Sequence, residues 1–173
     1  PLRNFLEKIA NRYFFTELYH TEEVLKAVSV KIATYVEIEK ITQVILEAIK
    51  DALKPEKIAI FLYDAERKCF QLRAALNFER REIKEDEFFI KYQKRTKGVL
   101  VLPEIDRMIE EIISKKEKEI LGQLKKALKE NEIELSLPLI VESELRGLIL
   151  LSNKSSGDAY SVEDISLLST LSS

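Results

Sequence analysis

The sequence predicts an α+β fold, in which a long N-terminal helix precedes an antiparallel sheet with helices on both faces. Residues 58–76 and 135–151 each contain two short apolar runs joined by a polar turn. Short apolar runs bounded by turn residues are typical of β-hairpins. Stretches with apolar residues at helical spacing precede, separate and follow the two hairpins. Hairpins that alternate with helices indicate an antiparallel sheet covered by helices.

The N-terminal part has a helical pattern. Residues 2–34 place apolar side chains at helical spacing, with no Gly or Pro after Pro1. A long helix with a narrow apolar stripe needs a partner, either its own domain after folding back or a second copy in a parallel dimer. A second helical pattern, 37–53, follows without a strong cap between the two. We divide the chain into an N-terminal linker or coiled-coil helix, 1–34, and a domain, 35–173.

The middle of the chain predicts three further elements. Residues 88–92 are a short amphipathic segment at helical spacing, ended by Gly98. Residues 99–102 predict a strand that Pro103 closes. Residues 104–131 predict a charged helix or helix pair, whose seven acidic and seven basic residues cancel. Balanced charge of this kind indicates a solvated helix face rather than an interaction patch.

The C-terminal hairpin and helix carry the most specific local signals. The strands 135–141 and 145–151 flank a three-residue polar turn. Gly147 inside the second strand indicates a close approach of the backbone to its neighbours. Ser161 and Asp164 have the spacing of a capping box, which begins a helix. The apolar face that we expect for this helix consists of Val162, Ile165, Leu168 and Leu171.

Composition excludes several classes of protein. The net charge of −2 gives no electrostatic footprint for nucleic acid. A single cysteine, Cys69, excludes a disulfide framework and a cysteine-based metal site, and it suits a reducing cytoplasm. The only histidine, His20, lies outside any predicted pocket, so haem ligation and triad catalysis have no support. No apolar run approaches the roughly 18 residues of a membrane span. We therefore expect no cofactor, no metal, no nucleic acid and no membrane insertion.

The last third of the chain resembles a known family. The motif Leu-Pro-Leu is followed by a turn, by Leu-Arg-Gly-Leu-Ile-Leu-Leu, and then by Lys154, Gly157, Tyr160 and Glu163-Asp164. This order resembles the C-terminal half of a GAF domain, and LSNKSSGDAYSVEDISLL is similar to GAF domains of bacterial sensor histidine kinases. The resemblance implies a GAF (PAS-like) sheet whose first and last helices pack on one side. A ligand pocket then lies under the middle helices on the other side.

The resemblance also implies a role. We expect a non-catalytic sensory or regulatory domain of a two-component sensor histidine kinase, in the cytoplasmic part of a membrane-anchored protein. A kinase domain would follow in the same chain. The expected partner is a second copy, held through the N-terminal helix with residues 37–53 and 161–173 in the same bundle. The alternatives are a ligand-free dimerisation module and the effector-binding domain of a transcription regulator. A related branch that reduces methionine sulfoxide needs several cysteines, which this chain lacks.

The candidate ligand-binding residues follow from strand alternation. Leu148 and Leu150 should share one sheet face with alternate residues of the strand at 58–63, and residues 88–95 could roof that face. The mixture of apolar groups, phenolic hydroxyls and one guanidinium suits a small apolar or aromatic ligand, and it suits plain core packing as well. The candidate residues are Ala59, Phe61, Tyr63, Tyr92, Arg95, Leu148 and Leu150.

A second candidate set is the pair Lys154 and Asp164. Cyclic-nucleotide-binding GAF domains carry an Asn-Lys … Phe … Asp-Glu motif with an internal Lys–Asp ion pair. Here Asn153, Lys154 and Asp164 match this motif, but Tyr160 replaces Phe and Ile165 replaces Glu. The remaining match predicts a structural ion pair that fixes the loop to the last helix. We expect this ion pair to compete with Asp164 as a capping residue.

Overall fold

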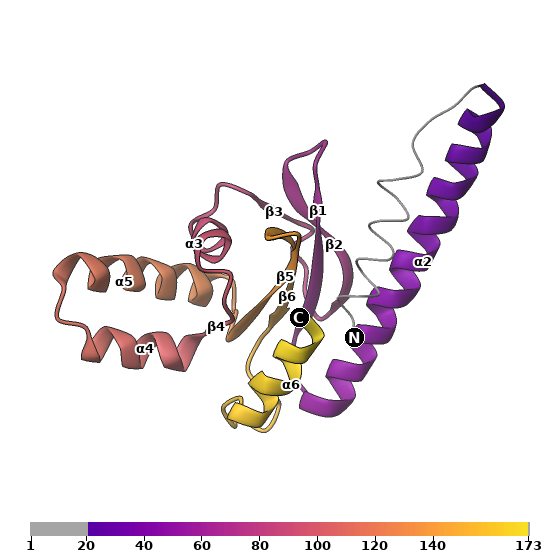
Figure 1. Cartoon of the computed structure of the whole chain (residues 1–173). Helices are drawn as coiled ribbons and strands as arrows, with labels where there is room; N and C mark the ends of the chain where they lie inside the picture. The colour runs from indigo at the N-terminus through magenta and orange to yellow at the C-terminus, as the bar shows by residue number, and fades with distance from the viewer. Residues whose placement is uncertain (1–20, 173) are drawn as a thin grey trace.

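The computed structural model describes residues 21–172, which alternate between helices and hairpins (Figure 1). The first twenty residues, including His20 and most of the predicted N-terminal helix, lie outside the described residues. The helices are α2 (Thr21–Leu53), α3 (Phe88–Thr96), α4 (Leu102–Glu111), α5 (Lys115–Glu130) and α6 (Val162–Ser172). The strands are β1 (Ile58–Asp64), β2 (Cys69–Leu76), β3 (Glu82–Lys84), β4 (Leu100–Val101), β5 (Leu135–Val141) and β6 (Glu144–Leu151).

The strands form one antiparallel sheet in the order β3-β2-β1-β6-β5-β4. The two predicted hairpins lie side by side because β1 pairs with β6. Gly147 sits on β6, between β1 and β5. A Cβ there would lie 2.8 Å from the Phe61 carbonyl oxygen and 2.9 Å from a methyl group of Leu139. The close approach expected at this glycine is therefore confirmed.

The helices cover both faces of the sheet (Figure 1). Helices α2 and α6 pack on one face, while α3, α4 and α5 cover the other. Alternation along β1 divides its side chains between them. Ile58 and Ile60 face α2, whereas Ala59 and Phe61 face the opposite side. The predicted α+β fold, with helices on both faces, is confirmed.

Two predictions of individual elements need correction or refinement, and one short strand was missed. The strand expected at 99–102 is only two residues long, and Pro103 lies in the first turn of α4. Proline is tolerated there because its missing N–H would have no partner within the helix. The charged segment is a pair of helices, and Ser114 caps the second by accepting a hydrogen bond from the Glu117 backbone N–H at 3.4 Å. The short edge strand β3 was not expected.

The two terminal helices also differ in detail from the prediction. The patterns at 2–34 and 37–53 join in the described part, because α2 runs without a break from residue 21 to residue 53. The domain division at 34/35 stays a prediction. Val162 is 78% exposed, so it does not belong to the buried face of α6, whereas Ile165 and Leu168 do. Val162 is the first residue of α6, directly after the capping Ser161.

Candidate functional site

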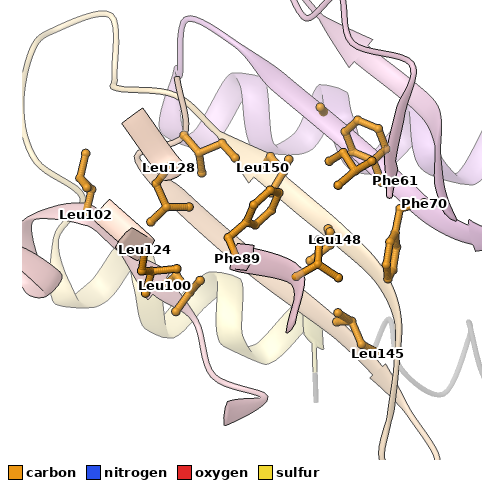
Figure 2. Close-up of a cluster of buried hydrophobic side chains, with 14 of the residues drawn as sticks. Phe61, Phe70, Phe89, Leu100, Leu102, Leu124, Leu128, Leu145, Leu148 and Leu150 are labelled. Atoms are coloured by element: carbon orange, nitrogen blue, oxygen red, sulfur yellow. The ribbon is translucent and has the colours of Figure 1, made fainter. Parts of the chain in front are cut away.

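The sheet face under α3 and α5 carries a cluster that we call the α3-side cluster. It contains three buried aromatic residues, Phe61, Phe70 and Phe89, among aliphatic side chains from β6 and α5. Figure 2 shows the Phe89 ring among Leu148, Leu150 and Leu128. One aromatic ring from α3 thus fills the space between the sheet and α5.

The structure places most of the predicted ligand-binding residues on this face. Ala59, Phe61, Leu148 and Leu150 are at most 1% exposed and belong to the α3-side cluster. Tyr63 and Tyr92 are half-buried and pack against the same cluster. Only the two tyrosines among these six residues carry a polar side-chain group, so the lining is mainly apolar.

Arg95 lies apart from this lining. The residue is exposed, and its guanidinium carbon lies 5.3 Å from the centroid of the Tyr92 ring. Phe88, which was expected to help roof the face, is also exposed. The buried face of α3 consists of Phe89, Ile90 and Gln93 instead. Arg95 therefore contacts the outer side of Tyr92 rather than the cluster.

Glu85, in the turn between β3 and α3, and Lys94 on α3 hold Tyr63 in place. The Tyr63 hydroxyl donates a hydrogen bond to a Glu85 carboxylate oxygen at 2.8 Å, and Lys94 Nζ lies 3.2 Å from the same oxygen. The hydrogen bond to Glu85, together with burial, raises the pKa of Tyr63. The hydrogen bonds from Tyr63 and Lys94 lower the pKa of Glu85. The three groups form a polar rim beside the cluster.

A fully buried hydrogen-bond network ties α3 to β5, and sequence reasoning missed it. Gln93 Nε2 donates to the carbonyl oxygens of Gly98 and Ser136 at 3.1 and 2.9 Å. The Ser136 hydroxyl donates to Gln93 Oε1 at 2.7 Å. Both residues have no exposed surface. Since every polar atom of the Gln93 amide has a partner, these hydrogen bonds offset the cost of burying the amide, and the network orients α3.

The loop before α6 contains the pair Lys154 and Asp164. Lys154 Nζ lies 2.5 Å from Asp164 Oδ2, and the two side chains are 17% and 18% exposed. The same Asp164 oxygen accepts a hydrogen bond from the Ser161 backbone N–H at 2.8 Å. The Ser161 hydroxyl in turn accepts from the Asp164 backbone N–H at 3.1 Å. The expected competition is therefore wrong, because one carboxylate oxygen has lone pairs for both donors.

Tyr160 completes this loop contact. Its hydroxyl donates a hydrogen bond to the Ser152 carbonyl oxygen at 2.6 Å, and Lys154 Nζ lies 5.4 Å from its ring centroid. Burial, together with the charges of Glu134 and Asp164, raises the pKa of Tyr160. Tyr160 is buried in the cluster under α2 and α6, so these residues fix the loop to that side of the domain.

Comparison with known protein families identifies the family of this chain. The sequence matches the GAF domain family over residues 37–173, which is most of the chain. The chain belongs to the GAF domain family. No curated protein matches this GAF domain in sequence.

Several solved GAF-like structures are similar to it. A GAF domain/HD domain protein from Geobacter sulfurreducens has 15% identity and a TM-score of 0.56, over 79% of this chain and 88% of that one. A fragment of a methyl-accepting chemotaxis protein has 16% identity and a TM-score of 0.57, over 84% and 90%. A free methionine-R-sulfoxide reductase from Thermoplasma acidophilum has 14% identity and a TM-score of 0.54, over 80% and 89%. At these identities the likeness shows the fold alone.

The described residues of the GAF domain contain neither a cluster of metal ligands nor a membrane-spanning helix. Within the described residues, no three His, Cys, Asp or Glu side chains gather as a metal site. Cys69 is buried, and its sulfur lies 3.4 Å from Gln71 Nε2. Among residues 21–172, no helix combines the length and the apolar composition needed to cross a bilayer.

Proposed function

We propose that this GAF domain is a non-catalytic sensory module of a signalling protein, and that its output passes through α2 in a parallel homodimer. Membership of the GAF family supports a regulatory role. The similar structures include a domain of a methyl-accepting chemotaxis protein, which supports signalling as the context. The C-terminal motif, similar to those of bacterial sensor histidine kinases, favours a two-component kinase. In that setting, a kinase domain follows in the same chain, and the domain lies in the cytoplasmic part of a membrane-anchored protein.

The exposed apolar side of α2 carries this proposal. One side of the helix buries Leu46 and Ile49 against the sheet. On a different side, Val44 is 69% exposed. It follows Ile41 by three residues and precedes Ala48 by four, and neither of these is fully buried. This spacing aligns the three residues on one helix face, as in the seam of a coiled coil.

The length of α2 suits a relay. Its 33 residues span about 50 Å, at 1.5 Å per residue. In Figure 1 the N-terminal half of α2 extends past the sheet, while its C-terminal half lies along it. A helix anchored to the domain at one end and free of it at the other can transmit a shift to a neighbouring element.

A charge placed on the exposed face tests the dimer. We expect Val44→Glu to convert the dimer to monomer in sedimentation velocity at micromolar concentration, because two buried glutamates would face each other across the seam. The fold should survive, since Val44 makes little contact within its own domain. Gln43→Glu adds the same charge at an exposed neighbouring position off the seam, and it should leave the dimer intact.

Two results would overturn the relay. If the unmodified chain is monomeric at micromolar concentration, the exposed apolar face of α2 has no partner copy. If Val44→Glu and Gln43→Glu remain equally dimeric, the interface lies elsewhere. Removal of residues 1–34 is the complementary test of the predicted linker, and we expect it to weaken the dimer.

The sensory input that we propose is a small apolar or aromatic molecule bound on the α3 side of the sheet. Its contacts would be the candidate residues on that face, with Tyr63 and Tyr92 as polar groups at the rim. At a hundredfold excess over the dissociation constant, a ligand of the folded state stabilises it by about 2.7 kcal/mol. Mass spectrometry of an extract of the purified protein, followed by thermal shift with the molecules found, tests this input.

A ligand-free relay is the second candidate. The observation that favours it is the packing of Phe61, Leu148 and Leu150, which are buried against the domain's own side chains. If the extract contains no bound molecule and a metabolite panel gives no thermal shift, the domain relays motion without a ligand of its own.

A further inference from the structure

The segment 77–81, between β2 and β3, crosses one end of the α3-side cluster, and we call it the strap. Its ends are fixed. Asn77 Nδ2 donates a hydrogen bond to the Glu56 carbonyl oxygen at 3.0 Å, and the Arg81 carbonyl oxygen accepts from the Leu72 backbone N–H at 2.8 Å. Within the described chain, residues 78–80 make no backbone–backbone hydrogen bond. Side-chain contacts alone therefore hold the centre of the strap.

The first of these contacts is the ring of Phe78. It meets the Phe61 ring edge-on, with 5.8 Å between centroids and 80° between planes. Phe61 has no exposed surface, whereas Phe78 is half-buried. Phe78 thus lies over Phe61 at the surface of the α3-side cluster. The edge-on geometry of an aromatic pair stabilises it only slightly more than the burial of the two rings alone does.

The second contact is the guanidinium of Arg80, which joins three separate segments. Its Nε donates to the Glu82 carbonyl oxygen at 2.9 Å, and its Nη1 donates to Asn131 Oδ1 at 2.6 Å. Its Nη2 pairs with the Glu87 carboxylate. One side chain therefore connects the strap to the start of α3 and to the end of α5. Planar guanidinium groups are suited to such multiple contacts.

Glu87 links this contact to the position of α3. The carboxylate oxygen that pairs with Arg80 also accepts a hydrogen bond from the Lys84 backbone N–H at 3.0 Å. It thereby closes the turn that leads into α3. Loss of the Arg80 contact would leave the Glu87 side chain held by the Lys84 N–H alone and would loosen the first turn of α3. Phe89, which fills the space above the sheet, belongs to that same turn.

We propose that the strap is a lid over the α3-side cluster, with Arg80 as its latch. Opening removes the Phe78 ring from Phe61 and gives a flat aromatic or apolar molecule access to the sheet. The inference rests on the proposed ligand-binding face. The latch is suited to opening because the Arg80 and Glu87 side chains are 36% and 25% exposed. Ion pairs open to water are screened by salt, unlike the apolar contacts beneath them.

A tryptophan reporter tests the lid in the full chain. The protein contains no tryptophan, so Phe78→Trp introduces a single indole into the strap. We expect Arg80→Ala in this background to raise the acrylamide quenching constant about threefold, since local opening exposes the ring without global unfolding. Raising the salt from about 0.1 M to about 1 M should raise quenching in the presence of Arg80 and have little effect in its absence.

Two controls keep the test decisive. Arg107→Ala removes an equal charge from an exposed pair with Glu111 on α4 and should leave quenching unchanged. The Leu72 and Lys84 backbone N–H groups donate hydrogen bonds to Arg81 and to Glu87. Their hydrogen exchange, compared between the otherwise unmodified chain and Arg80→Ala, covers the case in which tryptophan does not pack like Phe78. The lid is overturned if Arg80→Ala changes neither the quenching nor the local exchange. It is also overturned if Arg80→Ala simply unfolds the domain, as shown by a fall in the urea midpoint that accounts for the rise in quenching.

Indole as a probe separates the lid from the ligand-binding proposal. Faster binding of indole to Arg80→Ala than to the unmodified chain, in stopped-flow measurements, supports a latch on the entrance. Equal binding rates overturn the lid while the ligand-binding face stands. An Arg80-dependent opening with no binding of indole or of any extracted molecule supports the moving strap. That last result overturns the proposed ligand instead.

Discussion

The two faces of the sheet are closed in different ways. The cluster under α2 and α6 is aliphatic apart from Tyr160, and its helices contribute a continuous row that includes Leu46, Ile49 and Leu168. The α3-side cluster has three phenylalanines, and specific polar contacts hold its helices in place. These contacts are the Gln93–Ser136 network, the Tyr63–Glu85 hydrogen bond and the contacts of Arg80. One face therefore depends on long-helix packing, and the other depends on a few directional bonds.

This difference suggests that the two faces respond differently to the loss of a contact. Packing of a long helix onto a sheet gains from many small contacts, so it resists the loss of any single one. Directional bonds between short elements are lost singly, and each loss frees a segment. We expect the face under α2 to be the stable frame of the domain and the α3 side to be the part that responds.

Phe89→Ala should have the largest effect and should distinguish the two faces. Removal of a buried phenylalanine destabilises by about 3–5 kcal/mol, and Leu46→Ala on the other face by about 2–5 kcal/mol. Urea unfolding measures both losses. Hydrogen exchange should then rise mainly in α3 to α5 for Phe89→Ala, and throughout the domain for Leu46→Ala. Uniform exchange in both variants would show that the faces unfold as one unit.

Gly147→Ala tests the strand that both faces share. The new Cβ would meet the Phe61 carbonyl oxygen at 2.8 Å, so β1 and β6 must move apart. Overpacking of this kind destabilises by about 1–3 kcal/mol, which thermal and urea unfolding would detect. Gly122→Ala is the matched control, because nothing lies within 4 Å of its Cβ position. In the interior of α5 it should stabilise by about 0.5–1 kcal/mol. Equal effects at the two glycines would contradict the close packing of β6.

Gln93→Ala sharpens the comparison on the α3 side. It leaves the buried Ser136 hydroxyl and the carbonyl oxygens of Gly98 and Ser136 without Gln93 as their hydrogen-bond partner. We expect this loss to lower the free energy of unfolding by about 1–3 kcal/mol. Ser136→Ala, which leaves the two backbone bonds of Gln93, should have a smaller effect. A double-mutant cycle in urea measures the coupling between the two. Additive losses would show that the bond between these side chains contributes little.

The sequence predicted the two faces but not the bonds that hold one of them. Alternation in β1 correctly assigned Ile60 and Phe61 to opposite sides, because the period of a strand is fixed by its geometry. The buried face of α3 differs from the predicted one, since Phe88 is exposed while the polar Gln93 is buried. An amide is buried only where its partners are present, and Ser136 lies 43 residues away. Such a pair leaves no local pattern.

The contacts of Arg80 were missed for the same reason. Asn131 is 51 residues away, and β3 is too short to show alternation. By contrast, Ser161 and Asp164 are three residues apart, and their capping box was predicted from spacing alone. Local spacing therefore predicted the capping contacts at the start of α6, whereas the long-range polar pairs could be identified only from the structure.

Lys154→Ala should have the smallest effect, on the α2 side. Its pair with Asp164 is mostly buried, so we expect a loss of about 1–2 kcal/mol, between the limits for exposed and buried pairs. Burial alone would raise the pKa of Asp164. The hydrogen bonds from Lys154 and the Ser161 N–H, together with the charge of Lys154, outweigh burial and lower the pKa of Asp164 below its ordinary value.

This sign gives the pH dependence. A carboxyl whose pKa is lower in the folded state stabilises the fold above its unfolded pKa, and this stability is lost as the pH falls through the folded value. The difference between the unmodified chain and Lys154→Ala should therefore be constant near neutral pH and shrink below about pH 4. Urea unfolding across this range measures it. Lys126→Ala removes an exposed partner of Glu130 at 3.8 Å and should change stability by less than about 0.5 kcal/mol at any pH. If Lys154→Ala behaves like this control, Asp164 acts only as the cap of α6, and the loop is held by Tyr160 and by the hydrogen bonds between Ser155 and Lys54.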